Sequence, residues 1–355
     1  MDEGERNRQL TVPESPPTSR RGFLVAGGLV LLAAFFVLGY LAAFLLTPYH
    51  GRSSVAEIEV RRGDTFSAVA RELADKGVVS HPRLFVFWTR LHGLDTRVHR
   101  GLYRFEGAAS PRSVLDGLVR GRTVVHKVTI PEGFTVRQIG RLLERKGLAT
   151  PERFAAAVSE PAVLASLGTG SMEGYLFPTT YFFRALATEE EIVKTMFTEF
   201  KDTFTAEMEV RARQLGLTRH QLVTLASIIE KEGGPLDEMP IVSAVFHNRL
   251  KRGMRLQSDP TVIYGLEDFN GDLTREDLRT PGPYNTYRIN GLPTGPIANP
   301  GLAAMKAALF PADVGYLYFV SRNDGSHYFS ESLREHNSAV RKYQKNRRAG
   351  FTERP

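Results

Sequence analysis

One short stretch of the chain carries two acids at the end of an apolar run. Residues 225–234 read LASIIEKEGG and include Glu230 and Glu232. With about 100° between successive helical residues, these two acids fall on opposite edges of the apolar face and cannot share one site. A carboxyl group packed against apolar side chains can hold its proton near neutral pH, as general-acid catalysis requires. Glu230 is the candidate general acid, because the small side chains of Ala226 and Ser227 leave space beside it.

A glutamate in this position also has a plain structural interpretation. A nearby Lys or Arg can hold a glutamate at the rim of a helix without any chemistry, and helix geometry alone does not separate the two interpretations. Other chemistries leave no matching pattern. The sequence has no His-Glu-x-x-His pair for zinc, no Gly-x-Ser-x-Gly nucleophile turn, and no cysteine for thiolate catalysis or a disulfide. We therefore expect no metal ion and no cofactor.

Three helical stretches must position these acids. Apolar periodicity predicts helices over residues 189–215, 219–232 and 239–252. A long segment rich in Gly, Pro, Asn and Tyr follows them, and a closing strand is expected over residues 316–321. The helices are expected to supply a hydrophobic core, whereas long irregular segments of this kind often line a cleft.

A tandem repeat precedes those helices. The stretch RGDTFSAVARELADKG from Arg62 aligns with EGFTVRQIGRLLERKG from Glu132, 70 residues further along the chain. Each copy predicts a strand, a glycine turn, a Thr N-cap, an amphipathic helix and a Lys-Gly ending. The pattern resembles a LysM-like module, a small domain that binds N-acetylated glycans in many exported proteins.

The two copies of this repeat are not expected to be equivalent. The first copy, over residues 55–126, is the better match to a LysM-like module. The second copy, over residues 127–170, lacks the closing strand and runs on into helices, so we interpret it as a half-repeat or connecting subdomain. The alternative is that neither copy binds glycan, because a strand, a glycine turn and a capped helix begin many unrelated α+β units.

The N-terminal region predicts a membrane anchor. Residues 22–46 contain no charged side chain. At about 1.5 Å per residue such a helix is roughly 37 Å long, enough to cross a hydrocarbon core of about 30 Å. A cleaved signal peptide is the alternative, but its apolar region is usually shorter. Arg20 and Arg21 at the start of the span place residues 1–21 in the cytoplasm as a tail and everything after about residue 50 outside.

Charge and composition limit the classes of partner that the protein is expected to bind. The 355 residues carry a formal net charge of +7, with 42% hydrophobic and 24% charged residues, as expected for folded domains. Lys and Arg are mixed with Asp and Glu, and no basic run is interleaved with aromatic residues, so we expect no nucleic-acid partner. An anionic polymer or a lipid surface suits an exported basic domain better.

Six segments, taken together, resemble one known family. They are EGYLFPTTY from Glu173, LASIIEKE from Leu225, FHNRL from Phe246, MRLQSDPTVIYG from Met254, PYNTYRINGLPTGPIANPG from Pro283 and YLYFVSRNDGSHYFS from Tyr316. Behind an apolar helix and a LysM-like region, they resemble the endolytic murein transglycosylases, the MltG or YceG-like family, over about residues 22–345. The resemblance implies an α+β chain with a single N-terminal transmembrane helix, a LysM-like module and a mixed α+β catalytic domain over residues 171–345. The cytoplasmic tail and a second tail, residues 346–355, lie outside the resemblance.

The resemblance also implies an activity. Members cleave the β-1,4 bond between N-acetylmuramic acid and N-acetylglucosamine inside a glycan strand and leave a 1,6-anhydro end. The family's catalytic glutamate falls on Glu230, which would protonate the glycosidic oxygen and then accept the proton of the muramic O6 hydroxyl. Ordinary glycosidases need two carboxylates. Here the substrate's own acetamido group and hydroxyl can take the place of the second, although Glu173 or Asp259 could approach Glu230 in the fold.

Two other functions stay open at this stage. One is a non-enzymatic, glycan-binding scaffold of the cell-wall synthesis machinery, and the other is a hydrolytic muramidase that admits water. For the enzyme, the family implies a place in the cell inner (plasma) membrane, single-pass, with the catalytic domain on the exterior or periplasmic side. Expected partners are peptidoglycan strands, penicillin-binding proteins, and elongation or division factors.

Further residues are expected to bind the substrate. Tyrosine rings offer flat faces to sugars, amide side chains can bond acetamide and hydroxyl groups, and a guanidinium suits the lactyl carboxylate or the peptide stem. The expected substrate-binding residues are Glu173, Tyr175, Ser227, Asn248, Arg249, Gln257, Asp259, Tyr264, Tyr284, Asn285 and Tyr287. For each of them, core packing or turn support is the alternative.

Overall fold

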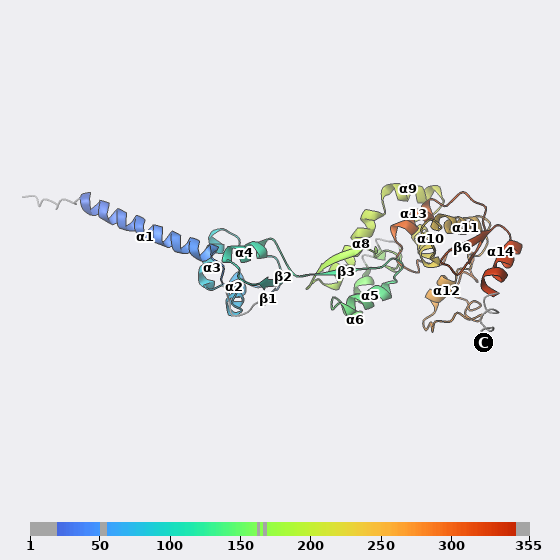
Figure 1. Cartoon of the computed structure of the whole chain (residues 1–355), viewed down its shortest axis with the longest axis horizontal. Helices are drawn as coiled ribbons and strands as arrows, with labels where there is room; N and C mark the ends of the chain where they lie inside the picture. The colour runs from blue at the N-terminus through green and yellow to red at the C-terminus, as the bar shows by residue number, and fades with distance from the viewer. Residues whose placement is uncertain (1–19, 50–54, 162–163, 166–168, 346–355) are drawn as a thin grey trace, which may run out of the picture. The chain divides into compact units, whose positions relative to one another are not determined.

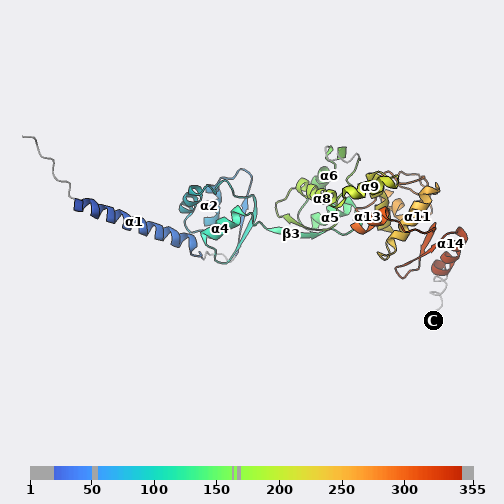
Figure 2. The ribbon, with the colours of Figure 1, turned by 90° about the horizontal axis from the view of Figure 1, so that it is seen from above.

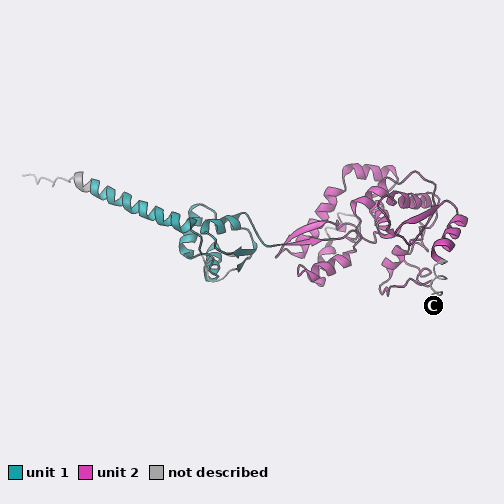
Figure 3. Ribbon diagram, in the orientation of Figure 1, with its two compact units in different colours: residues 1–124 teal, residues 125–355 magenta. Residues whose placement is uncertain are grey.

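The computed structural model describes residues 20–49, 55–161, 164–165 and 169–345. The chain divides into two compact units, residues 1–124 and residues 125–355 (Figure 3). Both units contain helices and strands, which confirms the expected α+β class. The predicted tails, residues 1–21 and 346–355, lie almost entirely outside the described residues.

Helix α1 (Arg20–Leu46) begins the described chain (Figures 1 and 2). Its 27 residues correspond to a length of about 40 Å. The part from Leu24 to Leu46 is long and apolar enough to cross a membrane, by length and composition. Near its C-terminal end, α1 packs against the rest of the first unit. Leu45 is buried there, and the Phe44 ring lies edge-on to the His81 ring, with 5.8 Å between their centroids.

The first unit continues with a strand-helix-helix-strand-helix order. Its elements are β1 (Val55–Val60), α2 (Phe66–Asp75), α3 (Pro82–Leu91), β2 (Gly101–Glu106) and α4 (Pro111–Val119). Strands β1 and β2 are antiparallel, with Val55 opposite Glu106. Alternate residues of β1 point into the core, as its period of two requires. The Thr65 side chain accepts the Ala68 N–H and so caps the start of α2.

The second unit begins with the same order of elements. They are β3 (Val125–Thr129), α5 (Val136–Arg145), α6 (Pro151–Val158), β4 (Thr180–Arg184) and α8 (Glu189–Thr203). Strand β4 pairs antiparallel with β3, with Val125 opposite Arg184, so the expectation that the second copy lacks its closing strand is wrong. The segment between α6 and β4 is longer than its counterpart between α3 and β2, and this longer insertion hides the strand in the sequence.

The rest of the second unit packs around one buried helix. The remaining elements are α9 (Ala206–Gln214), α10 (Arg219–Glu232), α11 (Met239–Lys251), α12 (Asp259–Gly265), α13 (Leu302–Leu309), β5 (Tyr318–Ser321), β6 (His327–Ser330), α14 (Leu333–Val340) and a π-helical turn (Arg341–Lys345). Helix α10 lies among α9, α11, α12 and α13 (Figure 1). Every residue from Leu222 to Ile229 is buried. The helix predicted over residues 189–215 is two helices, because the chain leaves helical geometry at Phe204.

The ends of α10 follow from its flanking residues. Thr218 and Gln221 form a capping box, in which each side chain bonds the backbone N–H of the other. At the other end Gly233 adopts φ +73°, a left-handed conformation that glycine takes at little cost. These local signals hold the last turn of α10, with its two acids, at one edge of the unit's core.

Candidate active site

Glu230 lies in the last turn of α10, partly buried. The backbone N–H of Gly301, which directly precedes α13, donates to Glu230 Oε2 at 3.0 Å. Burial raises the pKa of the Glu230 carboxyl above its ordinary value. The Gly301 hydrogen bond and the charge of Lys231 act in the opposite direction, whereas the negative charge of Glu132 raises the pKa further. The raised pKa favours the protonated form of a group that can still reach solvent, as a general acid needs.

Glu132 is a second carboxylate at this position. A Cβ atom built on Gly301 would overlap the Glu132 carboxylate, so only glycine leaves room for that side chain. Glu132 and Glu230 thus contact the same glycine from two directions. Once standard bond lengths are added, the overlap and the hydrogen bond place the two carboxylates no more than about 8 Å apart.

Sequence reasoning missed Glu132. It named Glu173 and Asp259 as the acids that could approach Glu230. The available signal was in the repeat, where Glu132 occupies the position that Arg62 has in the first copy. A reversal of charge at equivalent positions of two repeats indicates that the position has a different role in each copy.

Backbone hydrogen bonds lock the Glu132 turn to the segment that holds Gly301. The Gly133 N–H donates to the Asn299 carbonyl at 2.9 Å, and the Asn299 N–H donates to the Phe134 carbonyl at 2.9 Å. The buried Asn299 side chain also donates to the Phe134 carbonyl and accepts the Leu176 N–H. This pairing holds the Glu132 turn against the segment whose Gly301 N–H bonds Glu230, although Glu132 and Glu230 are far apart in the sequence.

Glu173 is buried next to this pairing, with only 4% of its surface exposed. Its carboxylate accepts the Val136 N–H, at the start of α5, and bonds Asn299 Nδ2 at 3.1 Å and the Tyr264 hydroxyl at 3.1 Å. Burial raises the pKa of Glu173 to about 7. These contacts anchor α5 and the Asn299 segment, so the structure places Glu173 behind the site and facing the protein.

Five further expected residues are also engaged inside the second unit. They are Tyr175, Ser227, Asn248, Arg249 and Asn285. Asn248, Arg249 and Asn285 each donate to main-chain carbonyl groups of the irregular segments, as turn-supporting side chains do. Ser227 accepts the N–H of Ile297 at 3.0 Å, which ties the Gly- and Pro-rich segment to α10.

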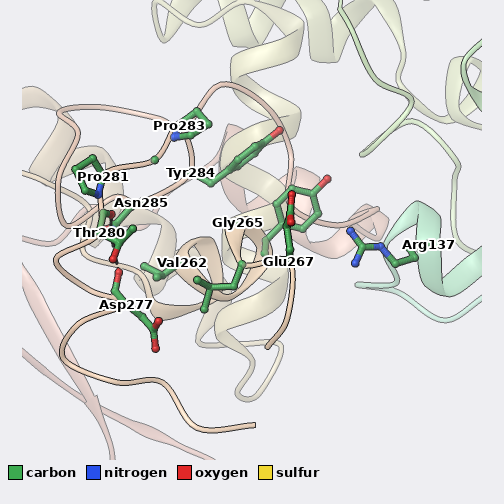
Figure 4. Close-up of a pocket in the computed structure, with 13 residues that line it drawn as sticks. Arg137, Val262, Gly265, Glu267, Asp277, Thr280, Pro281, Pro283, Tyr284 and Asn285 are labelled. Atoms are coloured by element: carbon green, nitrogen blue, oxygen red, sulfur yellow. Dashed lines mark hydrogen bonds between the residues drawn. The ribbon is translucent and has the colours of Figure 1, made fainter. Parts of the chain in front are cut away.

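A cavity of about 310 Å³ brings together Tyr264, Tyr284 and Asn285 (Figure 4). The two tyrosine rings meet edge to face at 4.8 Å between centroids. Arg137 extends from α5 toward the cavity from the side opposite Asn285 (Figure 4). Flat rings with a cation at the rim suit an anionic sugar. Tyr264 connects this cavity to the Glu173 cluster through its hydroxyl.

A second cavity, of about 480 Å³, contains the other acid of α10. Its lining includes Glu232, Arg249, Gln257, Asp259 and Tyr287. Glu232 accepts a hydrogen bond from Ser258 Oγ at 2.5 Å, and burial raises its pKa to about 7. The Tyr287 hydroxyl donates to Asp259 at 2.5 Å. Glu230 and Glu232 therefore contact different partners, in agreement with their predicted places on opposite edges of the helix.

Within the described ranges, no cluster of three or more His, Cys, Asp or Glu side chains has the arrangement of a metal site.

Comparison with known proteins gives a consistent result. Residues 58–342 match the YceG-like family. A Bacillus subtilis protein named endolytic murein transglycosylase is 30% identical over 321 residues, which cover 84% of this chain and 88% of the relative. A Streptococcus pneumoniae protein of the same name is 28% identical over 352 residues, which cover 90% of this chain and 64% of that longer relative.

A solved structure is similar as well. The crystal structure of a YceG-like protein from Listeria monocytogenes is 31% identical, with a TM-score of 0.56, and the match covers 80% of this chain and 98% of that one. The family match extends over most of the chain, and the Bacillus relative is matched over most of its own length. This chain therefore belongs to the YceG-like family.

Proposed function

We propose that this protein is an endolytic murein transglycosylase, which cleaves bonds inside the glycan strands of peptidoglycan. The observation that carries the proposal is Glu230, a partly buried carboxyl with a raised pKa, held by the Gly301 N–H at the edge of the core. The printed names of the Bacillus and Streptococcus relatives support the same activity.

In the proposed reaction Glu230 starts as the acid. It donates its proton to the oxygen that links muramic acid to the next sugar, and the bond from that oxygen to the muramic C1 breaks. Positive charge develops at C1 and the ring oxygen. The muramic O6 hydroxyl then bonds to C1 and gives its proton to the Glu230 carboxylate, which regenerates the acid. No water is consumed, and the product ends in a 1,6-anhydro ring.

A hydrolytic muramidase is the second candidate, and Glu132 is the observation that favours it. Glycosidases that act with two carboxylates hold them about 5–5.5 Å apart when they retain configuration and about 6.5–9.5 Å apart when they invert it. The upper limit of about 8 Å for Glu132 and Glu230 is compatible with both ranges. In this candidate Glu132 would take a proton from water, and the water oxygen would bond to C1.

Two surfaces are proposed to hold the strand. In the second unit, the Tyr264 and Tyr284 rings would contact a sugar, while Arg137 would meet a lactyl or peptide carboxylate. In the first unit, the LysM-like module would bind glycan independently of cleavage. Its repeat pattern supports this assignment, since the Thr-capped helix and glycine turn occur in both copies.

Location follows from α1. We propose that α1 anchors the chain in the plasma membrane, with residues 1–21 in the cytoplasm and both units outside, as the length of α1 and the arginines at its start support. Penicillin-binding proteins and elongation or division factors are the proposed neighbours, because new strands emerge at this surface.

Mass spectrometry of the products tests the proposal. The full-length protein in detergent is incubated with uncrosslinked glycan strands, and the new ends are identified. We expect internal fragments with anhydro ends, one water lighter than hydrolysis products. Reducing ends would instead establish the muramidase. Intact strands would contradict both enzymatic candidates and favour a scaffold.

A further inference from the structure

Helix α3 has apolar side chains on two faces. Phe85 and Thr89 point into the core of the first unit and are buried. A second stripe, formed by Leu84, Phe87 and Leu91 at helical spacing, faces outward, and Trp88 lies between the two faces, partly buried against the core of the first unit. Phe87 is 61% exposed and Leu91 is 67% exposed. Large apolar residues grouped in this way on a soluble surface mark a contact with another apolar phase.

The position of α3 beside α1 indicates which phase that is. His81, the residue before α3, packs against Phe44, two residues before the end of the apolar span. Two helical residues correspond to about 3 Å along the axis of α1. Ala109, just before α4, bridges to Tyr49 just after α1. When α1 crosses a bilayer, these contacts place the start of α3 near the end of the apolar span and therefore near the bilayer surface.

The charges on α3 also suit a lipid surface. Arg83 and Arg90 lie on the same side of the helix as Phe87, at i−4 and i+3 from it, and both are exposed. Arg90 is partly held by Ser67 and Asp95, while its chain still reaches the surface. Aromatic and leucine side chains flanked by arginine are typical of helices that lie in the headgroup region, where the arginines meet lipid phosphates.

We propose that the outward stripe of α3 docks on the outer lipid surface of the membrane that α1 crosses. The inference rests on the proposed anchorage through α1. It requires no partner protein, because every copy anchored by α1 brings α3 to lipid. The docked helix would hold the first unit against the bilayer, so that a strand bound by that unit would be captured close to the membrane.

The sequence supplies a built-in reporter, since Trp88 is the only tryptophan of the chain. Full-length protein is reconstituted in vesicles of phosphatidylcholine and phosphatidylglycerol, with or without bromine on the acyl chains. We expect brominated lipid to quench most of the Trp88 emission, and lipid to protect Trp88 from acrylamide in the water phase. The double variant Phe87→Ser and Leu91→Ser should lose most of both effects.

A matched control and a separate flotation assay keep the outcomes distinct. Leu236→Ser removes a leucine that is as exposed as Leu91, at 67%, from the second unit, and it should leave Trp88 quenching unchanged. Protein that floats with vesicles while Trp88 stays open to acrylamide would overturn the docking and leave the anchor in place, with the stripe free for a protein partner. Protein that does not float would overturn both. Cleavage of free strands in detergent, measured in parallel, reports the proposed activity independently.

Discussion

Gly301 offers a way to displace one carboxylate without changing it. Its backbone has φ −75° and ψ 172°, which alanine adopts freely, so Gly301→Ala adds only a Cβ that collides with the Glu132 carboxylate. The atom that must move is the far end of an exposed, flexible side chain. Because Gly301 is buried and caps the start of α13, where alanine is less favourable than glycine, we expect the free energy of unfolding to fall by about 1 kcal/mol, with the fold retained. The N–H that bonds Glu230 is retained.

The effect on the reaction follows from the charge. At the upper limit of about 8 Å, two unit charges interact by about 0.5 kcal/mol in water and by about 2 kcal/mol at an effective dielectric constant of 20. Removing the Glu132 charge should lower kcat/KM by about 2-fold to about 30-fold, since about 1.4 kcal/mol corresponds to a factor of ten. Glu132→Gln should produce the same loss, and the double variant should lose no more than either single variant.

The pH dependence of cleavage should show the direction in which Glu132 shifts the pKa of Glu230. The charge of Glu132 raises the pKa of Glu230, and Glu230 must be protonated to act, so activity falls as pH rises through that pKa. Without the Glu132 charge, the basic limb of the profile should move to lower pH. Strand cleavage is measured by chromatography over a series of pH values. Wild-type rates and an unmoved basic limb in Glu132→Gln would refute the role of Glu132, whereas reducing-end products lost selectively in this variant would favour the muramidase.

Three further outcomes are expected. Glu232→Gln should retain most cleavage activity, because Glu232 bonds Ser258 in a separate cavity, and loss comparable to that of a Glu230 variant would contradict the division of the two acids. The pKa of Glu173 is raised to about 7 from 4.5, so the folded state binds more protons than the unfolded state and the unfolding free energy should fall as pH rises from 4.5 to 7. Urea titrations should show a smaller fall in Glu173→Gln, and an identical slope would contradict the assignment. Tyr284→Ala should raise KM for strands by about 5-fold to 150-fold, from a stacking contribution of about 1–3 kcal/mol of the kind measured for other ring ligands, and an unchanged KM would remove the cavity of Figure 4 from the binding surface.

Local signals in the sequence predicted the elements that carry the site. The helix expected over residues 219–232 matches α10, because Thr218, Gln221 and Gly233 encode its two ends without help from the rest of the fold. The division of Glu230 from Glu232 also follows from helix geometry alone. The repeat was visible for the same reason, since each copy has its own Thr cap and glycine turn.

Long-range packing decided what the sequence could not predict. Strand β4 was missed because it pairs with β3 across a long insertion. Glu132 approaches Glu230 only because the second copy's turn pairs with Asn299, far along the chain. Arg249 and Asn285 were expected at the substrate because their types suit sugars, yet their donors bond carbonyl groups of irregular loops, a use that appears only once those loops are folded. Their direct contact with substrate stays a prediction.

The central claim is that the Glu230 carboxyl transfers a proton to the glycosidic oxygen. The most direct test is the turnover of Glu230→Gln on uncrosslinked strands, with circular dichroism to confirm the fold. Glutamine keeps the size of the side chain and can still accept the Gly301 hydrogen bond, but it has no transferable proton. We expect cleavage to fall by about 100-fold to 10,000-fold, the usual contribution of a general acid. Turnover equal to that of the wild-type protein would contradict the account.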